Sequence, residues 1–126
     1  MSKRTPYVSR EWRMYLNDMI DCAELAFVFS KDLNADIFTA KSMAYEATLR
    51  QIELMGEAAG HIPADVQNAA SDIPWREMIA LRNRLAHGYF AIDKDVLWNL
   101  LNEDLPLTLD GLIHLRNSLV QGTDNE

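Results

Sequence analysis

Apolar side chains recur at three- and four-residue steps through most of this chain, a spacing that places them on one face of an α-helix. The first such stripe consists of Trp12, Tyr15, Leu16, Met19, Ile20, Ala23, Ala26 and Phe27. No segment requires the two-residue alternation of a half-buried strand. Five glycines and four prolines in 126 residues also provide few of the turns that a β-sandwich needs. The sequence therefore predicts an all-α fold.

Capping residues predict where the first two helices begin and end. We expect a first helix over about residues 10–30, with Ser9 as its N-cap. The second helix should begin after Thr39, another candidate N-cap, and end before Gly60, which suits the left-handed conformation beyond a helix C-terminus. The small residues of "GEAAG" (residues 56–60) predict close packing against another helix, in the chain or from a second subunit.

The second half of the chain predicts shorter helices bounded by prolines and a glycine. A short helix should follow Ile62, and a longer one should begin at Pro74 and stop near Gly88. Asp93 is the expected N-cap of a leucine-rich last helix, which Pro106 should kink or divide because proline has no N–H to donate. Together these elements predict an up-and-down bundle of four to five helices.

The chain length is sufficient for one domain with a core of its own, spanning residues 1–126 with loose ends at 1–8 and 120–126. The lone cysteine, Cys22, allows no disulfide within the chain, and its apolar neighbours favour a small buried residue over a reactive thiol. No signal-peptide pattern and no apolar run of bilayer length is visible. We therefore expect a cytoplasmic protein that does not bind a membrane.

The formal net charge is −7, which disfavours a general nucleic-acid coat because phosphate binding depends mainly on Lys and Arg. Residues 75–90, however, contain three arginines and one glutamate, a local sum of +2 that leaves −9 for the rest of the chain. A small basic spot on an acidic body indicates a site that acts on a phosphate, or a docking surface, rather than a long RNA track.

The basic spot includes "RNRLAHGYF", residues 82–90. Each polar residue has an ordinary structural interpretation, with solvated arginines, His87 at the negative end of a helix and Tyr89 packed with its hydroxyl at the surface. Arg82 and His87 lie five residues apart, about 140° around an ideal helix, so they do not share one face. Either the chain turns at Gly88 and redirects His87, or a second subunit brings its own copy across a two-fold axis. We favour the second alternative.

The residue types in this stretch suit phosphodiester chemistry. Arginine binds phosphate oxygens through a fork of donors and stays charged, and histidine moves a proton near neutral pH. In RNA the 2′-hydroxyl is a built-in nucleophile, so a base, a cation and an acid are sufficient for cleavage without a metal. The residue pattern by itself leaves the solvated-surface interpretation open.

The stretch also resembles the Arg, four residues, His, any residue, Tyr motif of the HEPN superfamily of helical RNases. The similarity is greatest to the HepT toxins of paired HEPN and minimal-nucleotidyltransferase (MNT) toxin–antitoxin systems. The surrounding sequence agrees, with "LRQIELMGEAAGHIP" before the motif, "DIPWREMIALRNRLAHGYF" around it and "NEDLPLTL" in the last helix. The resemblance covers roughly residues 10–115.

This resemblance implies a homodimer whose two motifs meet in a cleft and cut RNA, with tRNA as the target, without metal. Arg82 and His87 then take the catalytic positions, and Asn83, the polar residue after the arginine, supports them. Tyr89 becomes the residue to which a partner MNT nucleotidyltransferase transfers AMP from ATP, which silences the toxin in what is called a type VII pair. Arg84 is an additional cation to which the resemblance assigns no role.

The remaining polar groups predict no second site. His61, His87 and His114 lack the spacing of metal ligands, and no cofactor is expected. Glu53 and Glu57 lie four residues apart on one helix face, where a solvated surface is favoured over an acid pair.

Two other hypotheses stay open at this stage. One is a purely structural bundle, which would be favoured if Arg82, His87 and Tyr89 lay far from any dimer cleft. Separately, Glu46 and Arg50 fit an i,i+4 surface ion pair. A second functional class is a non-catalytic helical subunit that docks and regulates a nucleotidyltransferase, which the net charge of −7 suits slightly better than RNA binding. The two classes differ in whether substitution of His87 abolishes activity.

Overall fold

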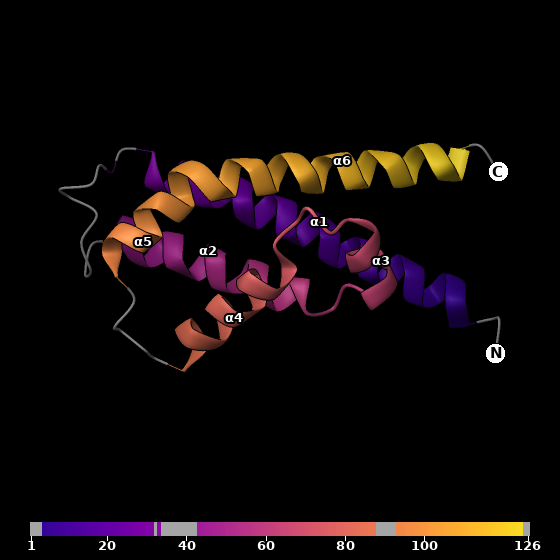
Figure 1. Cartoon of the computed structure of the whole chain (residues 1–126), viewed down its shortest axis with the longest axis horizontal. Helices are drawn as coiled ribbons and strands as arrows, with labels where there is room; N and C mark the ends of the chain where they lie inside the picture. Colours follow the sequence, from indigo (N-terminus) through magenta and orange to yellow (C-terminus); the bar gives the residue numbers. More distant parts are fainter. Residues whose placement is uncertain (1–3, 32, 34–42, 88–92, 125–126) are drawn as a thin grey trace.

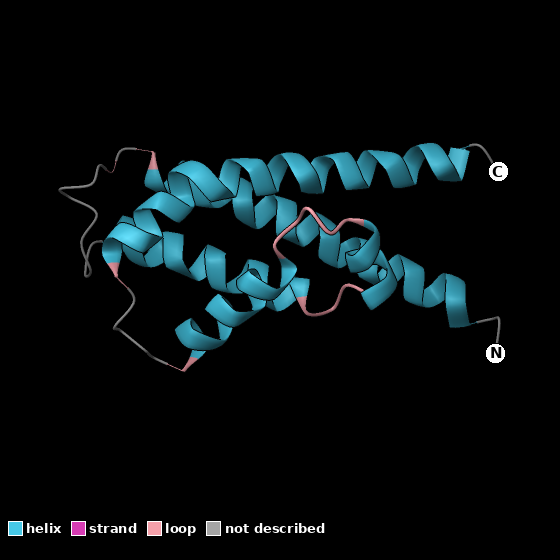
Figure 2. Ribbon diagram, viewed as in Figure 1, coloured by secondary structure: helices cyan, strands magenta, loops and turns pink. Residues whose placement is uncertain are grey.

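The computed structural model describes residues 4–31, 33, 43–87 and 93–124. All regular structure among these residues is helical, and none of them forms a strand (Figure 2). The helices are α1 (Arg4–Ser30), α2 (Met43–Ala59), α3 (Ala64–Ala69), α4 (Trp75–Ala86), α5 (Lys94–Asn99), the π-helical η1 (Leu100–Asp104) and α6 (Leu105–Asp124). The predicted all-α class is confirmed.

The long helices form an up-and-down bundle in which α2 packs against both α1 and α4, and α1 also packs against α6 (Figure 1). The chain reverses direction between α1 and α2, and again between α2 and α4. The helix α6 then runs back to the end of the molecule where α1 begins. The start of α6 faces α4, and these two helices line a common cavity with α2.

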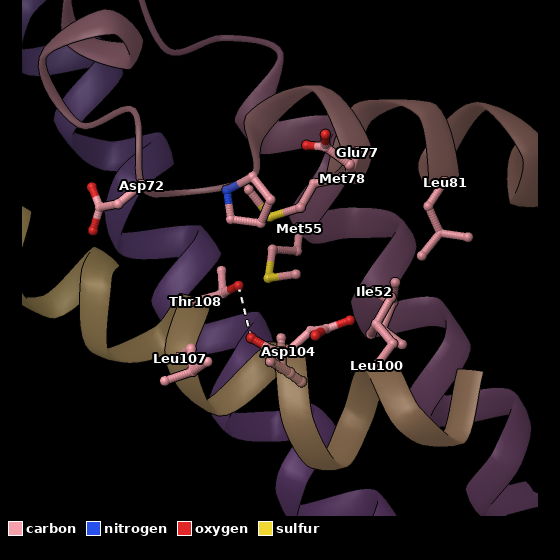
Figure 3. Close-up of a pocket in the computed structure, with 12 residues that line it drawn as sticks. Ile52, Met55, Asp72, Glu77, Met78, Leu81, Leu100, Asp104, Leu107 and Thr108 are labelled. Atoms are coloured by element: carbon pink, nitrogen blue, oxygen red, sulfur yellow. Dashed lines mark hydrogen bonds between the residues drawn. The ribbon is translucent and has the colours of Figure 1, made fainter. Parts of the chain in front are cut away.

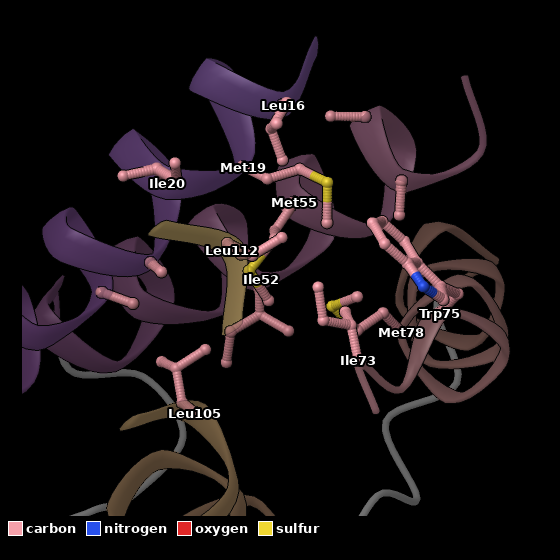
Figure 4. Packing of buried hydrophobic residues seen from close by; sticks show 14 of the residues in the cluster. Leu16, Met19, Ile20, Ile52, Met55, Ile73, Trp75, Met78, Leu105 and Leu112 are labelled. Carbon is pink, nitrogen blue, oxygen red and sulfur yellow. The ribbon is translucent and has the colours of Figure 1, made fainter. Parts of the chain in front are cut away.

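The core lies where these helices converge (Figure 4). The largest fully buried side chains are Leu16, Met19, Ile20, Thr48, Leu97, Leu105 and Leu112. The buried Trp75 completes the core from α4, and its indole N–H donates to the carbonyl of Ala70 at 3.0 Å. Thr48 and Thr108 are buried without loss of hydrogen bonding because each hydroxyl donates to the carbonyl four residues earlier.

Gly56 is the point of closest approach between α2 and α4. A Cβ atom placed on Gly56 would lie 2.5 Å from the Cβ of Arg82 and 2.6 Å from the carbonyl oxygen of Met78. Both distances are far below van der Waals contact, so only glycine allows the backbones to come this close. The predicted close packing of "GEAAG" is confirmed at this residue.

The first helix starts earlier than the apolar stripe predicts. It begins at Arg4, so residues 4–8 belong to α1 and Ser9 lies inside the helix instead of capping it. Pro6 is compatible with this start because the N–H groups of a first helical turn have no partner within the helix. The last helix likewise continues to Asp124, beyond the expected boundary at residue 120.

Gly60 does follow the end of α2, but its φ lies outside the left-handed region. The chain leaves the helix through tighter turns instead, in which the N–H of His61 donates to Ala58 and that of Ile62 donates to Ala59. The expected left-handed cap was therefore wrong. Thr39, expected to cap α2, lies outside the described residues.

The predicted boundaries in the second half are confirmed with small shifts. Pro63 and Pro74 directly precede α3 and α4, and the carboxylate of Asp93 accepts from the N–H of Asp95 at 2.7 Å at the start of α5. Pro106 divides the last helix because it offers no N–H to the preceding turn. The five-residue π segment η1 ends at Asp104, directly before α6, and the N–H of Leu105 donates to the carbonyl of Leu100.

No helix within the described ranges is both long and apolar enough to cross a bilayer.

The Gly56 contact yields a stability prediction. Gly56→Ala should lower the free energy of unfolding by about 1–3 kcal/mol, because the carbonyl of Met78 belongs to the α4 backbone and does not move aside easily. Urea denaturation followed by circular dichroism measures this change. Gly60→Ala is the matched control, since a Cβ there meets nothing closer than 3.4 Å, and it should be neutral or add up to about 1 kcal/mol. Equal stability of the two variants would show that α2 and α4 are not in close contact.

Candidate functional site

The candidate site lies at the C-terminal end of α4, where the side chain of Arg82 reaches across to α2. Its Nη2 and Nε atoms donate to the same carboxylate oxygen of Glu57, Oε2, at 2.6 Å and 3.1 Å. The Arg82 side chain is 33% exposed and that of Glu57 is 51% exposed. The ion pair is therefore at the surface, where solvent screens it and where other groups are able to reach the guanidinium.

Asn83 holds the same guanidinium from the other side. The Nη1 atom of Arg82 donates to the Oδ1 atom of Asn83 at 3.1 Å. All three guanidinium nitrogens thus have a partner, two contacts going to α2 and one to the adjacent residue of α4. Because a guanidinium is planar, these three hydrogen bonds fix the orientation of the whole fork.

His87 is the C-cap residue of α4. Its backbone N–H donates to the carbonyl of Asn83 at 3.2 Å, and its φ and ψ of −90° and 9° end the helical run. Its side chain is exposed, at the end of the helix where the backbone dipole is negative. Arg84, in the last turn of α4, is exposed as well.

The structure thus brings Arg82 and Asn83 together and places His87 one helical turn further along, beyond the last residue of α4. The helix ends at Ala86, so the departure from helical geometry starts before Gly88. Gly88 and Tyr89 lie outside the described residues. The site at the described end of α4 therefore consists of Arg82, Asn83 and His87, with Glu57 joined from α2.

Glu57 is the residue that sequence reasoning missed. It was expected to lie on a solvated face with Glu53, and its side chain is indeed 51% exposed, but the sequence did not indicate its contact with the motif arginine. Glu53 instead accepts from Arg50 at 3.2 Å, so Arg50 pairs with Glu53 and not with Glu46 as predicted. The available signal for Glu57 was its position next to Gly56, since a residue beside a helix–helix contact is within reach of the other helix.

A separate cavity of about 560 Å³ opens between α2, α4 and the start of α6 (Figure 3). Its apolar part includes Ile52, Met55, Met78 and Leu81. The charged residues that line it are all acidic, namely Asp72, Glu77 and Asp104. A wall with carboxylates and no cation repels phosphate, so this cavity is not a candidate for RNA binding.

Comparison with known proteins identifies the chain's family. The family model "Ribonuclease HepT-like" matches residues 19–115, which include α2, α4 and the Arg82–His87 segment. The chain belongs to the HepT-like ribonuclease family. The HEPN resemblance expected from the motif is thereby confirmed.

Two relatives share more than a third of the aligned HepT-like sequence. The "Probable ribonuclease HepT" of Thermococcus cleftensis is 35% identical over 99 residues, 79% of this chain and 90% of the relative. The "Putative RNase MJ1380" of Methanocaldococcus jannaschii is 36% identical over 97 residues, 77% of this chain and 89% of the relative. No solved structure gives a significant match.

Cys22 in this HepT-like chain is a half-buried free thiol on α1. Burial raises its pKa above the ordinary value of 9.0, and the nearby carboxylates of Asp18 and Asp21 raise it further. The sequence predicted a buried residue, and the side chain is only half buried. The raised pKa nevertheless agrees with the predicted low reactivity, since the thiolate is the reactive form.

The raised pKa of Cys22 predicts slow alkylation. Iodoacetamide at pH 8 should react more slowly with the native chain than with the chain unfolded in urea, as measured by mass spectrometry. Because the unfolded thiol loses its proton first, this group should also lower stability as pH rises above 9.0. Cys22→Ser is the control and should lack that alkaline loss. Faster native alkylation than unfolded alkylation would contradict the assignment.

Proposed function

We propose that this protein is a metal-independent endoribonuclease and the toxin of a type VII toxin–antitoxin pair. Membership of the HepT-like ribonuclease family supports the ribonuclease activity. The observation that carries the assignment to particular residues is the fixed guanidinium of Arg82, held by Asn83 and Glu57 one turn before His87. Arg82 binds and stabilises the scissile phosphate, Asn83 orients Arg82, and His87 transfers the proton.

The reaction uses the RNA's own nucleophile. A base takes the proton of the 2′-hydroxyl, and the 2′-oxygen attacks the adjacent phosphorus while Arg82 stabilises the added negative charge. The bond from phosphorus to the 5′-oxygen breaks, an acid protonates that oxygen, and a 2′,3′-cyclic phosphate is left. Two proton transfers are thus required, at opposite sides of the phosphorus.

A homodimer accounts for both proton transfers. Each chain contributes one His87, and a two-fold axis that brings two motifs together supplies one histidine as base and one as acid. The exposed position of His87 beyond the end of α4 leaves its side chain accessible to a second copy. The proposed substrate is tRNA, and the proposed compartment is the cytoplasm, where that substrate resides.

AMPylation of Tyr89 by a partner MNT nucleotidyltransferase is the proposed means of neutralisation. Tyr89 lies two residues after His87 in the sequence. An adenylyl group on this residue adds bulk and a negative charge to the stretch of sequence that contains Arg82 and Arg84, and it would compete with the phosphate of RNA for these cations.

Cleavage of purified tRNA in the presence of EDTA tests the ribonuclease proposal. Wild-type protein made without any nucleotidyltransferase should cut tRNA, and His87→Ala should lose at least about 100-fold in rate, the contribution of a positioned proton-transfer group. His114→Ala is the matched control, because His114 is an exposed histidine on α6, and it should keep wild-type activity.

Absence of cleavage by a folded wild-type protein would favour the other class of function, a docking and regulatory subunit of a nucleotidyltransferase. The pairing of Arg82 with Glu57 and the net charge of −7 are the observations on its side. In that case His87→Ala would leave every activity of the complex unchanged.

Co-expression with an MNT nucleotidyltransferase tests the neutralisation. Intact-mass spectrometry should show the addition of one or more adenylyl groups, and peptide mapping should place them on Tyr89. Tyr89→Phe should stay unmodified and keep its tRNA cleavage in the presence of the partner. Modification of Tyr89→Phe to the wild-type extent would contradict the assignment of the modified residue.

A further inference from the structure

We propose that Glu57 is a positioning residue for Arg82 and also competes with the RNA phosphate for it. This inference rests on the proposed ribonuclease function. The carboxylate holds the guanidinium in the orientation that the phosphate needs. The phosphate must then take over one of the two hydrogen bonds that Glu57 makes in the free protein, while the other keeps the guanidinium in place.

The hydrogen bonds to Glu57 establish the positioning role. One oxygen, Oε2, receives both Nε and Nη2 of Arg82, at 3.1 Å and 2.6 Å. The Nε atom is the part of the guanidinium nearest the side-chain stem, so a bond there fixes the plane of the fork as well as its position. Asn83 contacts only Nη1, so this hydrogen bond by itself would not prevent rotation of the guanidinium plane.

Close packing at Gly56 determines which residue of α2 contacts the side chain of Arg82. Gly56 allows α4 to approach so closely that a Cβ atom added to Gly56 would lie 2.5 Å from the Cβ of Arg82. The next residue of α2, Glu57, is therefore within hydrogen-bonding distance of the Arg82 guanidinium. The same glycine thus determines both the helix contact and the partner of the arginine.

Charges on the other side of Glu57 oppose its movement away from Arg82. Glu57 also lines a hollow of about 260 Å³ between α1 and α2, together with Asp18 and Asp21. A carboxylate that swings into this hollow approaches two others of the same charge, which is unfavourable. In the free protein the Arg82 contact is therefore the favoured position of the Glu57 side chain.

Competition follows from the chemistry of the two anions. A phosphate uses the same fork of donors as a carboxylate, and two of the three guanidinium nitrogens bind Glu57 in the free protein. An exposed ion pair contributes at most about 1 kcal/mol. A phosphate that competes with this pair therefore loses about fivefold in affinity at most.

Two substitutions separate the two roles. Glu57→Gln removes the charge but keeps a carbonyl oxygen that accepts from Arg82, so KM for tRNA should fall about fivefold while kcat stays within about twofold of wild type. Glu57→Ala removes both the charge and the hydrogen-bond acceptor for Arg82. KM should fall similarly, and kcat should fall on the order of tenfold or more because the guanidinium of Arg82 is no longer held in place. Steady-state cleavage of tRNA measures both constants.

Glu53 provides a matched control one turn earlier on α2. Glu53→Gln and Glu53→Ala change the net charge by the same amount but break the Arg50 pair instead, so kcat and KM should both stay within about twofold of wild type. Thermal denaturation by circular dichroism verifies that all four variants fold.

The outcomes distinguish this inference from the function on which it rests. An equal fall of KM in Glu57→Gln and Glu53→Gln would mean a general charge effect and would overturn the competition. An unchanged kcat in Glu57→Ala would overturn the positioning role. In both cases a wild-type enzyme that cuts tRNA still supports the proposed function. A folded wild-type protein that does not cut tRNA removes the proposed function, and this inference with it.

Discussion

The close contact of α2 and α4 at Gly56 is the constraint on which the candidate site depends. The backbones approach so closely that a single added methyl group would meet the carbonyl of Met78 at 2.6 Å. This approach buries Met55 and Met78 in the common core and brings Arg82 to the surface of α2. A helix pair at an ordinary separation would leave Arg82 to solvent, as a flexible side chain without a fixed orientation.

The Glu57–Arg82 pair has a geometric role and contributes little to stability. Exposed ion pairs contribute between zero and about 1 kcal/mol, and both side chains here are substantially exposed. Stability comes instead from the apolar cluster beneath, in which Leu16, Met19 and Leu112 are almost completely buried. Substitutions at Glu57 are therefore suited to separating function from folding.

Much of the fold was predictable because helices leave local signals. The apolar stripes identified the helices, and Pro63, Pro74 and Asp93 each placed the start of a helix within one or two residues. The wrong boundaries also come from local signals, which in these cases are compatible with more than one conformation. Ser9 is a good N-cap by composition, but Pro6 and its neighbours also tolerate a first helical turn, so the helix continues back to Arg4. Gly60 permits a left-handed conformation but does not require one.

The candidate site was predictable only in part, because its partners come from two helices. The motif identified Arg82, Asn83 and His87 from one continuous stretch, and the hydrogen bond between Arg82 and Asn83 joins adjacent residues. Glu57 is 25 residues away from Arg82 in the sequence. Its role depends on which faces of α2 and α4 meet, and this is settled by packing at Gly56, which no local periodicity specifies.

The most direct test of this account is a double-mutant cycle on tRNA binding, measured by fluorescence anisotropy in the non-cleaving His87→Ala background. If Glu57 acts on the RNA through Arg82, Glu57→Gln tightens binding about fivefold when Arg82 is present and has no effect when Arg82 is replaced by alanine. Equal tightening in the two backgrounds would contradict the account, because it would show that Glu57 acts on RNA independently of the arginine.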